Sequence, residues 1–153
     1  MKIEKANQFD LQKILVLQKH CYQSEANLYQ DFSIPPLLQD KASIEAEFTS
    51  GTTFLKAMVD DQIVGSVRGK QEGNTCYIGR LIVDPGFQNR RIGSQLMRAI
   101  EQVFSDCRRY ELFTGHKSEK NLYLYKKLDY QAYKTQVVSE KLTLIFLEKI
   151  NTT

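Results

Sequence analysis

The stretch YIGRLIVDPGFQNRRIGSQLMRAIE, residues 77–101, decides the fold of this chain. Its first part, Ile78–Val83, is a run of branched apolar residues that predicts a strand buried in a sheet. Asp84-Pro85-Gly86 must end this strand, because proline has no N–H to donate and glycine tolerates a turn. From Ile92 onward, apolar residues recur at helical spacing and predict an amphipathic helix. These apolar positions are Ile92, Leu96, Ala99, Ile100, Val103 and Phe104.

The junction between this turn and this helix is suited to binding a phosphate. The first turn of a helix has N–H groups without intrahelical partners, and the helix dipole adds partial positive charge there. Gly93 would let a ligand approach the backbone closely, and Arg90 and Arg91 could add charge-assisted contacts. An ordinary strand, turn and helix with a solvated basic turn is the competing interpretation, because short glycine motifs occur often by chance.

DNA binding is another interpretation of the same basic residues. Phe87–Arg91 spells a string that occurs in homeodomain recognition helices, where an asparagine pairs with adenine. Such residues must lie in the middle of a helix, yet Pro85-Gly86 and Gly93 flank the string. A second basic pair, Arg108-Arg109, exists, but a net charge of +3 does not require nucleic acid. We therefore expect no nucleic-acid partner.

Length and composition indicate a single domain over residues 1–153. The chain is 42% hydrophobic and 25% charged, an ordinary composition for a protein with a core of its own. The first residues, MKIEKANQFD, lack an apolar signal core, and no apolar run approaches the length of a membrane span. We therefore expect a cytoplasmic protein without a membrane partner. The three cysteines are widely spaced and the two histidines have no clustered carboxylates beside them, so neither disulfides nor a metal site is expected.

The remaining segments predict that residues 77–101 belong to an α/β fold with a mixed (α+β) sheet. Thr75–Val83 and Tyr110–Thr114 flank the helix that begins at Ile92, so they should run parallel, with a ligand at their carboxyl ends. Gly79 inside the first of these strands suggests a bulge that would splay the central pair. The other expected strands are Lys2–Lys5, Thr52–Val59, Ile63–Lys70, Ala132–Val138 and Leu142–Ile150, and the other expected helices follow Asn7 or Asp10, cover Ser43–Phe48 and open at Ser118.

The segment Tyr22–Gln39 has no clear periodicity and is predicted to be a long connection. It can be a plain connector with helix ends, or a binding loop, since long loops in small domains often carry function. Its aromatic and acidic side chains could form a pocket for a cationic substrate. The candidates for this pocket are Tyr22, Glu25, Tyr29 and Asp31.

The chain resembles the GNAT superfamily of acetyl-CoA-dependent N-acetyltransferases. The resemblance covers the order of elements over nearly the full length and is specific in Ile78–Leu96 and Leu112–Tyr130. The acetyl-CoA motif of that family is Gln or Arg, two residues, Gly, one residue, and Gly or Ala. Gln88, Arg91 and Gly93 stand at its three positions here. Arg91 replaces a glycine, so either the backbone carries strain of about 1 kcal/mol at positive φ, or the turn is right-handed and the side chain reaches the pyrophosphate.

The resemblance implies transfer of the acetyl group of acetyl-CoA to a primary amine, of a small molecule or a peptide, by direct attack. Tyr125 stands at the position of the tyrosine that commonly acts as general acid, although a plain core role is its alternative. The pantetheine arm would lie in the splay, and a backbone N–H on the strand would hold the oxyanion. The residues expected to bind acetyl-CoA are Leu81, Ile82, Val83, Gln88, Asn89, Arg90, Arg91, Ile92, Gly93, Ser94 and Asn121.

Other departures from the family pattern leave alternatives open. Ser118 stands where the family often has asparagine, with Asn121 nearby, and Asp129 replaces the glycine that usually follows the helix. The strand Thr75–Val83 carries no glutamate, so no general base is assigned. A non-catalytic module that binds and senses acyl-CoA is therefore the alternative function. Pairing of exposed strands could give a homodimer.

Overall fold

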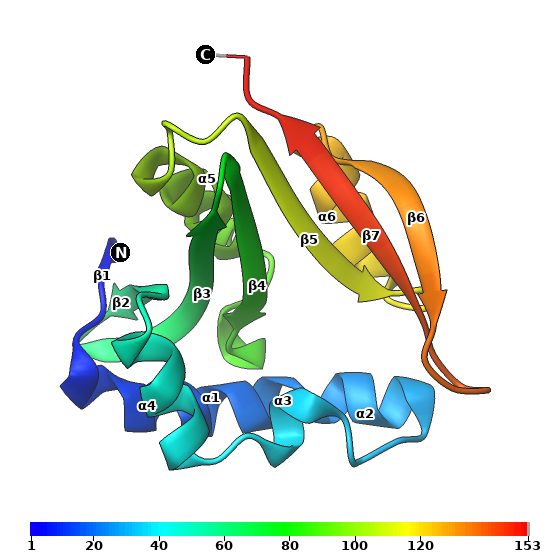
Figure 1. Cartoon of the computed structure of the whole chain (residues 1–153). Coiled ribbons are helices and arrows are strands. Elements are labelled where there is room, and N and C mark those ends of the chain that lie inside the picture. The colour runs from blue at the N-terminus through cyan, green and yellow to red at the C-terminus, as the bar shows by residue number, and fades with distance from the viewer. Residues whose placement is uncertain (153) are drawn as a thin grey trace.

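A computed structural model describes residues 1–152, which form one mixed seven-stranded sheet with helices on both faces (Figure 1). The strands are β1 (Lys2–Lys5), β2 (Thr53–Val59), β3 (Gln62–Glu72), β4 (Thr75–Val83), β5 (Arg109–Gly115), β6 (Gln131–Val137) and β7 (Thr143–Ile150). The α-helices are α1 (Leu11–Cys21), α2 (Gln23–Tyr29), α3 (Pro35–Leu38), α4 (Lys41–Thr49), α5 (Ile92–Val103) and α6 (Glu119–Lys127), with 3-10 turns at Gln8–Asp10 and Pro85–Phe87. The α/β class with a mixed sheet is confirmed.

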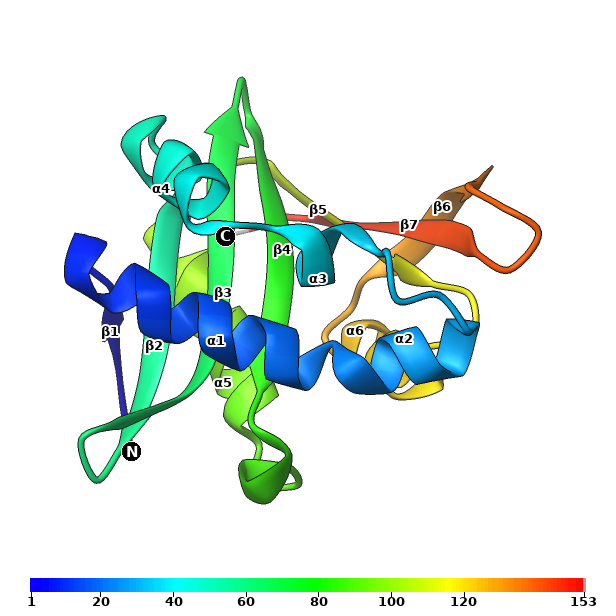
Figure 2. The ribbon, with the colours of Figure 1, turned by 90° about the horizontal axis from the view of Figure 1, so that it is seen from below.

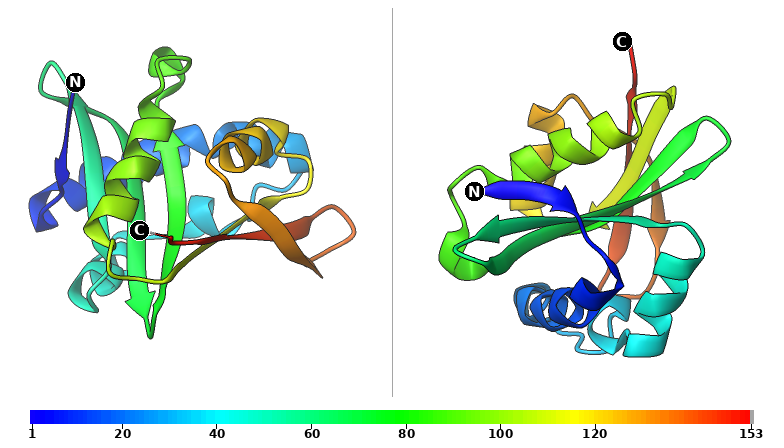
Figure 3. Two further views of the ribbon diagram at one scale, coloured as in Figure 1. Left: turned by 90° about the horizontal axis from the view of Figure 1, so that it is seen from above. Right: turned by 90° about the vertical axis from the view of Figure 1, so that its left-hand side faces the viewer.

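The strands lie in the order β1-β2-β3-β4-β5-β7-β6. Over the described residues β4 and β5 are the only parallel neighbours, as expected for two strands joined through a helix. The last two strands pair antiparallel, as predicted, and β7 inserts between β5 and β6. Figure 3 shows α5 on one face of the sheet and α1 with α4 on the other.

The central parallel pair is splayed, as the sequence suggested. β4 and β5 pair only from Thr75–Tyr77 to Arg109–Glu111, and beyond this ladder the two strands diverge toward α1 and α2 (Figure 1). The register between β3 and β4 shifts at the same level, which marks a bulge in β4. Gly79 was expected to mark this irregularity, but the residue with a left-handed backbone is its neighbour Arg80, with φ +50°. The bulge therefore changes the direction of the Arg80 side chain relative to the other side chains of β4.

The segment Tyr22–Gln39 is not a long loop, which corrects the prediction. It contains the helices α2 and α3, and Figure 2 shows α2 following α1 across the lower end of β4 toward α6. In α2 only Ala26 and Tyr29 are buried, so its apolar pattern is too short to show a helical period. Pro35 starts α3 at a position where proline is tolerated. The start of α2 forms part of one wall of the splay.

Two apolar clusters hold the sheet between its helices. The larger one packs α5 and α6 against the sheet and contains Leu96, Met97 and Ile100 with no exposed surface. Each such side chain contributes roughly 1.5–3 kcal/mol of burial free energy. Val103, placed on the apolar face from the sequence, is 39% exposed at the end of the helix. The smaller cluster joins α1 and α4 to the opposite face. Burial of α5 thus fixes its N-terminus beside the end of β4.

Candidate functional site

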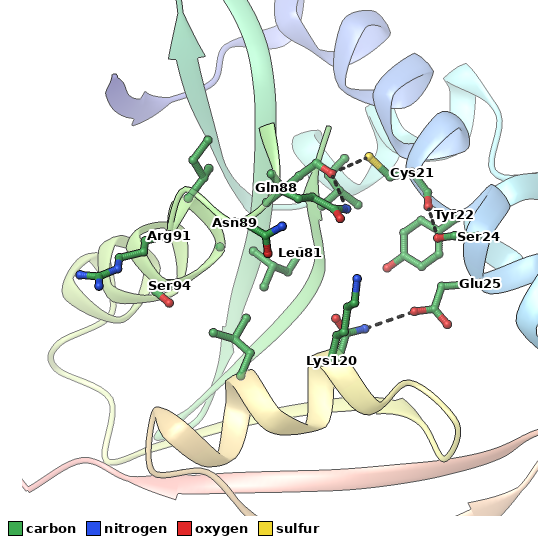
Figure 4. Close-up of a pocket in the computed structure, with 16 residues that line it drawn as sticks. Cys21, Tyr22, Ser24, Glu25, Leu81, Gln88, Asn89, Arg91, Ser94 and Lys120 are labelled. Atoms are coloured by element: carbon green, nitrogen blue, oxygen red, sulfur yellow. Dashed lines mark hydrogen bonds between the residues drawn. The ribbon is translucent and has the colours of Figure 1, made fainter. Parts of the chain in front are cut away.

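A cavity of ≈350 Å³ opens in the splay between β4 and β5. Its walls come from the end of β4, the start of α5, the α1–α2 junction and α6 (Figure 4). Most residues predicted to bind acetyl-CoA line it, namely Leu81, Ile82, Val83, Gln88, Asn89, Arg91, Ile92, Gly93, Ser94 and Asn121. The structure therefore brings together residues from β4, α1, α2, α5 and α6 at the carboxyl end of β4.

The turn before α5 exposes a series of backbone N–H groups. Asp84 accepts a hydrogen bond from the Gly86 N–H at 2.8 Å and starts the 3-10 turn. Asn89 and Arg91 then both adopt left-handed conformations, with φ of 65° and 63°. Arg91 is the N-cap of α5, and no side chain among the described residues caps this helix end. Alternating backbone of this kind forms a concave group of N–H donors that favours an anion.

The left-handed backbone decides between the two predictions for Arg91. Its φ of 63° and ψ of 19° are those of the strained alternative, in which glycine would be the better residue. Gly93 does not need its conformational freedom, since its φ is not positive. A methyl group built on Gly93 would lie 3.5 Å from Leu124 and 3.9 Å from Leu81, an ordinary packing distance. The absence of a side chain at Gly93 therefore keeps the cavity open and is not a requirement of the fold.

Arg90 is not among the residues that line the cavity, unlike Asn89 and Arg91 on either side of it. Its guanidinium stacks over the ring of the half-buried Phe87 at 5.0 Å, and Arg90 itself is exposed. The structure therefore does not place the Arg90 side chain with the other predicted acetyl-CoA ligands.

Tyr125 lies on α6 and is only 6% exposed, packed edge-on against Tyr130 at 6.1 Å between ring centroids. Burial raises the pKa of the Tyr125 phenol, and Tyr22 and Glu25 nearby raise that pKa further. No group within residues 1–152 is hydrogen-bonded to its hydroxyl. A phenol of this kind stays protonated at neutral pH and can donate a proton to an incoming acceptor.

Glu25 is held in the cavity wall by side chains from α6. The Ser118 hydroxyl donates to one carboxylate oxygen at 2.8 Å, and the Asn121 amide donates to the other at 3.3 Å. Asn121 also donates to the Thr114 hydroxyl at the end of β5. Figure 4 shows Glu25 and Tyr22 facing the cavity from the α1–α2 side. Ser118 and Asn121 thus share one task in this structure, which is to position the Glu25 carboxylate.

The other two candidates from the same segment lie outside the cavity. Tyr29 is buried, and its hydroxyl is bonded to the Ser118 hydroxyl and to the Lys117 N–H, each at 2.8 Å. Asp31 accepts hydrogen bonds from the hydroxyl and N–H of Ser33, which lower the pKa of its carboxyl. Tyr29 supports the wall from behind, and Asp31 caps a turn.

Four lining residues were not predicted, namely Cys21, Ser24, Lys120 and Leu124. Cys21 bonds the Val83 carbonyl at 3.4 Å, and burial raises the pKa of its thiol to about 12. It is therefore a neutral, half-buried thiol. Lys120 directly precedes Asn121, and only its place on the first turn of α6 could have signalled it.

Within the described residues no group of three or more His, Cys, Asp or Glu side chains is arranged to hold a metal ion. Over the same range, no helix has the length and apolar character needed to cross a membrane.

Comparison with known proteins gives consistent matches to acetyltransferases. The family model described as "Acetyltransferase (GNAT) family" matches residues 11–130. An acetyltransferase of Yersinia enterocolitica is 26% identical over 145 residues, which cover 93% of this chain and 96% of that protein. An acetyltransferase of Pectobacterium atrosepticum is 25% identical over 134 residues, covering 86% of this chain and 88% of that protein.

Solved structures share the fold at low sequence identity. The PaiA N-acetyltransferase of Thermoplasma acidophilum, solved with coenzyme A, has a TM-score of 0.79 and 19% identity, covering 98% of this chain and 99% of that one. The ribosomal-protein-S18-alanine N-acetyltransferase of Escherichia coli has a TM-score of 0.82 and 9% identity, covering 99% and 94%.

Proposed function

The chain belongs to the acetyltransferase (GNAT) family and is an acetyl-CoA-dependent N-acetyltransferase, and from this premise we propose that a primary amine attacks the thioester directly in the splay. The observation that carries the proposal is the cavity itself, where open backbone donors meet the Glu25 carboxylate; the buried phenol of Tyr125 directly follows the lining residue Leu124 on α6 and is not itself part of the lining. The domain proposed to carry this activity spans residues 1–153.

The residues around the cavity fit acetyl-CoA as co-substrate, which supplies the activated acetyl group. The diphosphate would bind the N–H groups from Gln88 to Ser94, where the helix dipole and the left-handed turn both favour an anion. Beyond Tyr77, the edge of β4 has no partner on β5 among the described residues, so its N–H and C=O groups can pair with an extended amide chain. The pantetheine arm has two such amides.

Glu25 is the acidic residue in the wall of the cavity, among the residues described. We assign its carboxylate to bind the acceptor as an ammonium and to take one proton from it. An alkyl amine with a pKa near 10.4 is mostly protonated at neutral pH, so this step must precede attack. The Ser118 and Asn121 hydrogen bonds hold the carboxylate on the side from which the amine would enter.

The amine nitrogen then forms a bond to the thioester carbon, and negative charge develops on the carbonyl oxygen. A backbone N–H of Leu81–Val83 would hold that oxygen. When the carbon–sulfur bond breaks, the departing thiolate takes the proton of the Tyr125 hydroxyl, which burial keeps protonated. The nitrogen is positively charged after the attack and gives its second proton to solvent as the amide forms. After the product leaves, Glu25 releases its proton to solvent and Tyr125 regains one from solvent.

The test is release of free thiol from acetyl-CoA across a panel of primary amines. We chose amino acids, polyamines, aminoglycosides and peptides with a free N-terminus, because they differ in charge around the amine. Thiol release that depends on one of these amines supports the proposal, as does a Tm that rises with acetyl-CoA. A chain that binds CoA without turnover on any amine would contradict it and would favour the sensing module.

A further inference from the structure

Arg80 is a half-buried arginine without an ion pair on the acceptor side of the bulge. Its guanidinium donates one hydrogen bond, to the Gln39 side-chain oxygen at 3.3 Å. No carboxylate in the part of the chain that the structure describes lies within ion-pair distance of it. The left-handed backbone at Arg80 directs this side chain out of the alternation of β4. Most of the donors of the guanidinium therefore remain open.

A second arginine, Arg68, lies close to Arg80 and adds to the excess of positive charge there. Arg68 on β3 is 4% exposed, stacks over Phe54 at 4.5 Å and pairs with Glu47 at 2.7 Å. Burial lowers the pKa of Arg68 to about 10, and the charge of Arg80 contributes to that lowering, so the two guanidinium groups interact. Both guanidinium groups donate to the same Gln39 oxygen at 3.3 Å, and among the described residues only Arg68 has a carboxylate partner. Partly buried charge without a partner is unfavourable, which makes the site receptive to an anion.

Neither Arg80 nor Arg68 lines the cavity, but the Arg68 guanidinium donates a hydrogen bond to Gln18, which lies one helical turn before Tyr22 at the end of α1. Tyr22 is therefore next to this cationic group. It lines the cavity, and the positive charges of Arg80 and Arg68 act on its phenol together with the negative charge of Glu25. Burial outweighs these charges and raises the pKa of the Tyr22 phenol. Charges of both signs, the Arg80 guanidinium and the Glu25 carboxylate, therefore act on the same tyrosine.

We propose that Arg80 binds a carboxylate of the acceptor, so that the acceptor is a free amino acid or another small amine that also carries a carboxylate. The guanidinium fork matches a carboxylate with two parallel hydrogen bonds, and Glu25 receives the ammonium at the other end. This inference rests on the proposed function, since it orients the amine toward the thioester. An uncharged amide in place of the carboxylate would leave Arg80 without a partner.

The test compares three versions of each acceptor in the thiol-release assay: the L-amino acid, its amide, and the amine that lacks the carboxyl group. We expect the wild-type kcat/KM to be at least 10-fold higher for the best amino acid than for its amide. Arg80→Gln should raise KM for the amino acid by about 10- to 100-fold and leave kcat/KM for the amide within about 2-fold. That unchanged amide rate also shows that the variant is folded.

Arg98→Gln is the matched control, since Arg98 is exposed on α5 away from the cavity. This variant should leave kcat/KM unchanged for both the amino acid and its amide. The inference is wrong if the amides or simple amines react as fast as the amino acids or faster. It is also wrong if Arg80→Gln leaves KM for the amino acid unchanged. Either result would leave acetyl transfer to amines intact. Turnover of no amine at all would overturn both.

Discussion

Replacing Arg91 by glycine should stabilise the protein, because the backbone at this position is left-handed. Arg91 has φ 63° and ψ 19°. An L-residue in that region is less stable by roughly 1–2 kcal/mol. Glycine avoids this strain, but its freer unfolded chain offsets about 0.5–1 kcal/mol of the gain. The free energy of unfolding should therefore rise by about 0.5–1 kcal/mol, and Tm by roughly 1–4 °C for a chain of this size.

Urea unfolding and thermal melts without ligand measure this change. Asn89→Gly is one comparison, because Asn89 is also left-handed at φ 65° but asparagine tolerates that region, so its gain should be smaller. Gln95→Gly is the matched control in the body of α5, where glycine should lower stability by about 1 kcal/mol. A Tm of Arg91→Gly below that of the wild type would refute the reasoning about backbone strain.

The same variant tests whether the Arg91 side chain contacts the diphosphate. If it does, calorimetry should show that the Kd of CoA rises up to about 10-fold although the protein has become more stable. If only backbone N–H groups bind the diphosphate, Kd should stay the same or fall. One substitution therefore gives separate measurements of stability and of CoA affinity.

Four further predictions concern the chemistry and the packing of the site. Tyr125→Phe should lower kcat by about 10²- to 10⁴-fold in the thiol-release assay with little change in the Kd of CoA, and an unchanged kcat would remove this phenol from the mechanism. Because burial beside Tyr22 and Glu25 raises the pKa of Tyr125 above its usual 10.0, the free energy of unfolding should fall as pH rises above that value, and less steeply in Tyr125→Phe; urea melts at alkaline pH compare the slopes. Glu25→Gln should lower kcat/KM most near neutral pH and least where the amine is already deprotonated, and a loss independent of pH would assign Glu25 to positioning alone. Gly115→Ala should lower the free energy of unfolding by about 1–3 kcal/mol, because the new methyl group would collide with the Tyr29 hydroxyl, whereas Gly79→Ala meets no atom within 4 Å and serves as the tolerated control.

The sequence predicted those parts of the fold whose signals are local. The apolar run before Asp84 and the period that starts at Ile92 lie within one stretch, so β4, the turn and α5 follow from pattern alone. The splay could be expected because Gly79 interrupts a buried strand, although the left-handed residue is Arg80. A glycine within a strand predicts a bulge nearby, but it does not predict which residue adopts the left-handed conformation.

The acceptor side could be predicted only in part, because contacts distant in sequence build it. Tyr22 and Glu25 were candidates by composition, but the place of Glu25 in the cavity depends on Ser118 and Asn121, more than 90 residues later in the chain. α2 is only 7 residues long, so it shows no period by which the inward face could be chosen. For that reason Tyr29 and Asp31 were as good candidates as Glu25 until the helix was placed.

The bulge in β4 has two consequences. The ladder with β5 stops just before the bulge, so the edge of Leu81–Val83 that faces β5 is open while β3 still pairs with Ile82 and Val83, and Arg80 at the bulge donates a hydrogen bond to Gln39. A strand without the bulge would shift every later side chain to the opposite face. In the proposed mechanism, Arg80 at the bulge recognises the acceptor, and the segment that directly follows it, Leu81–Val83, binds the acyl donor, so the bulge would link the two.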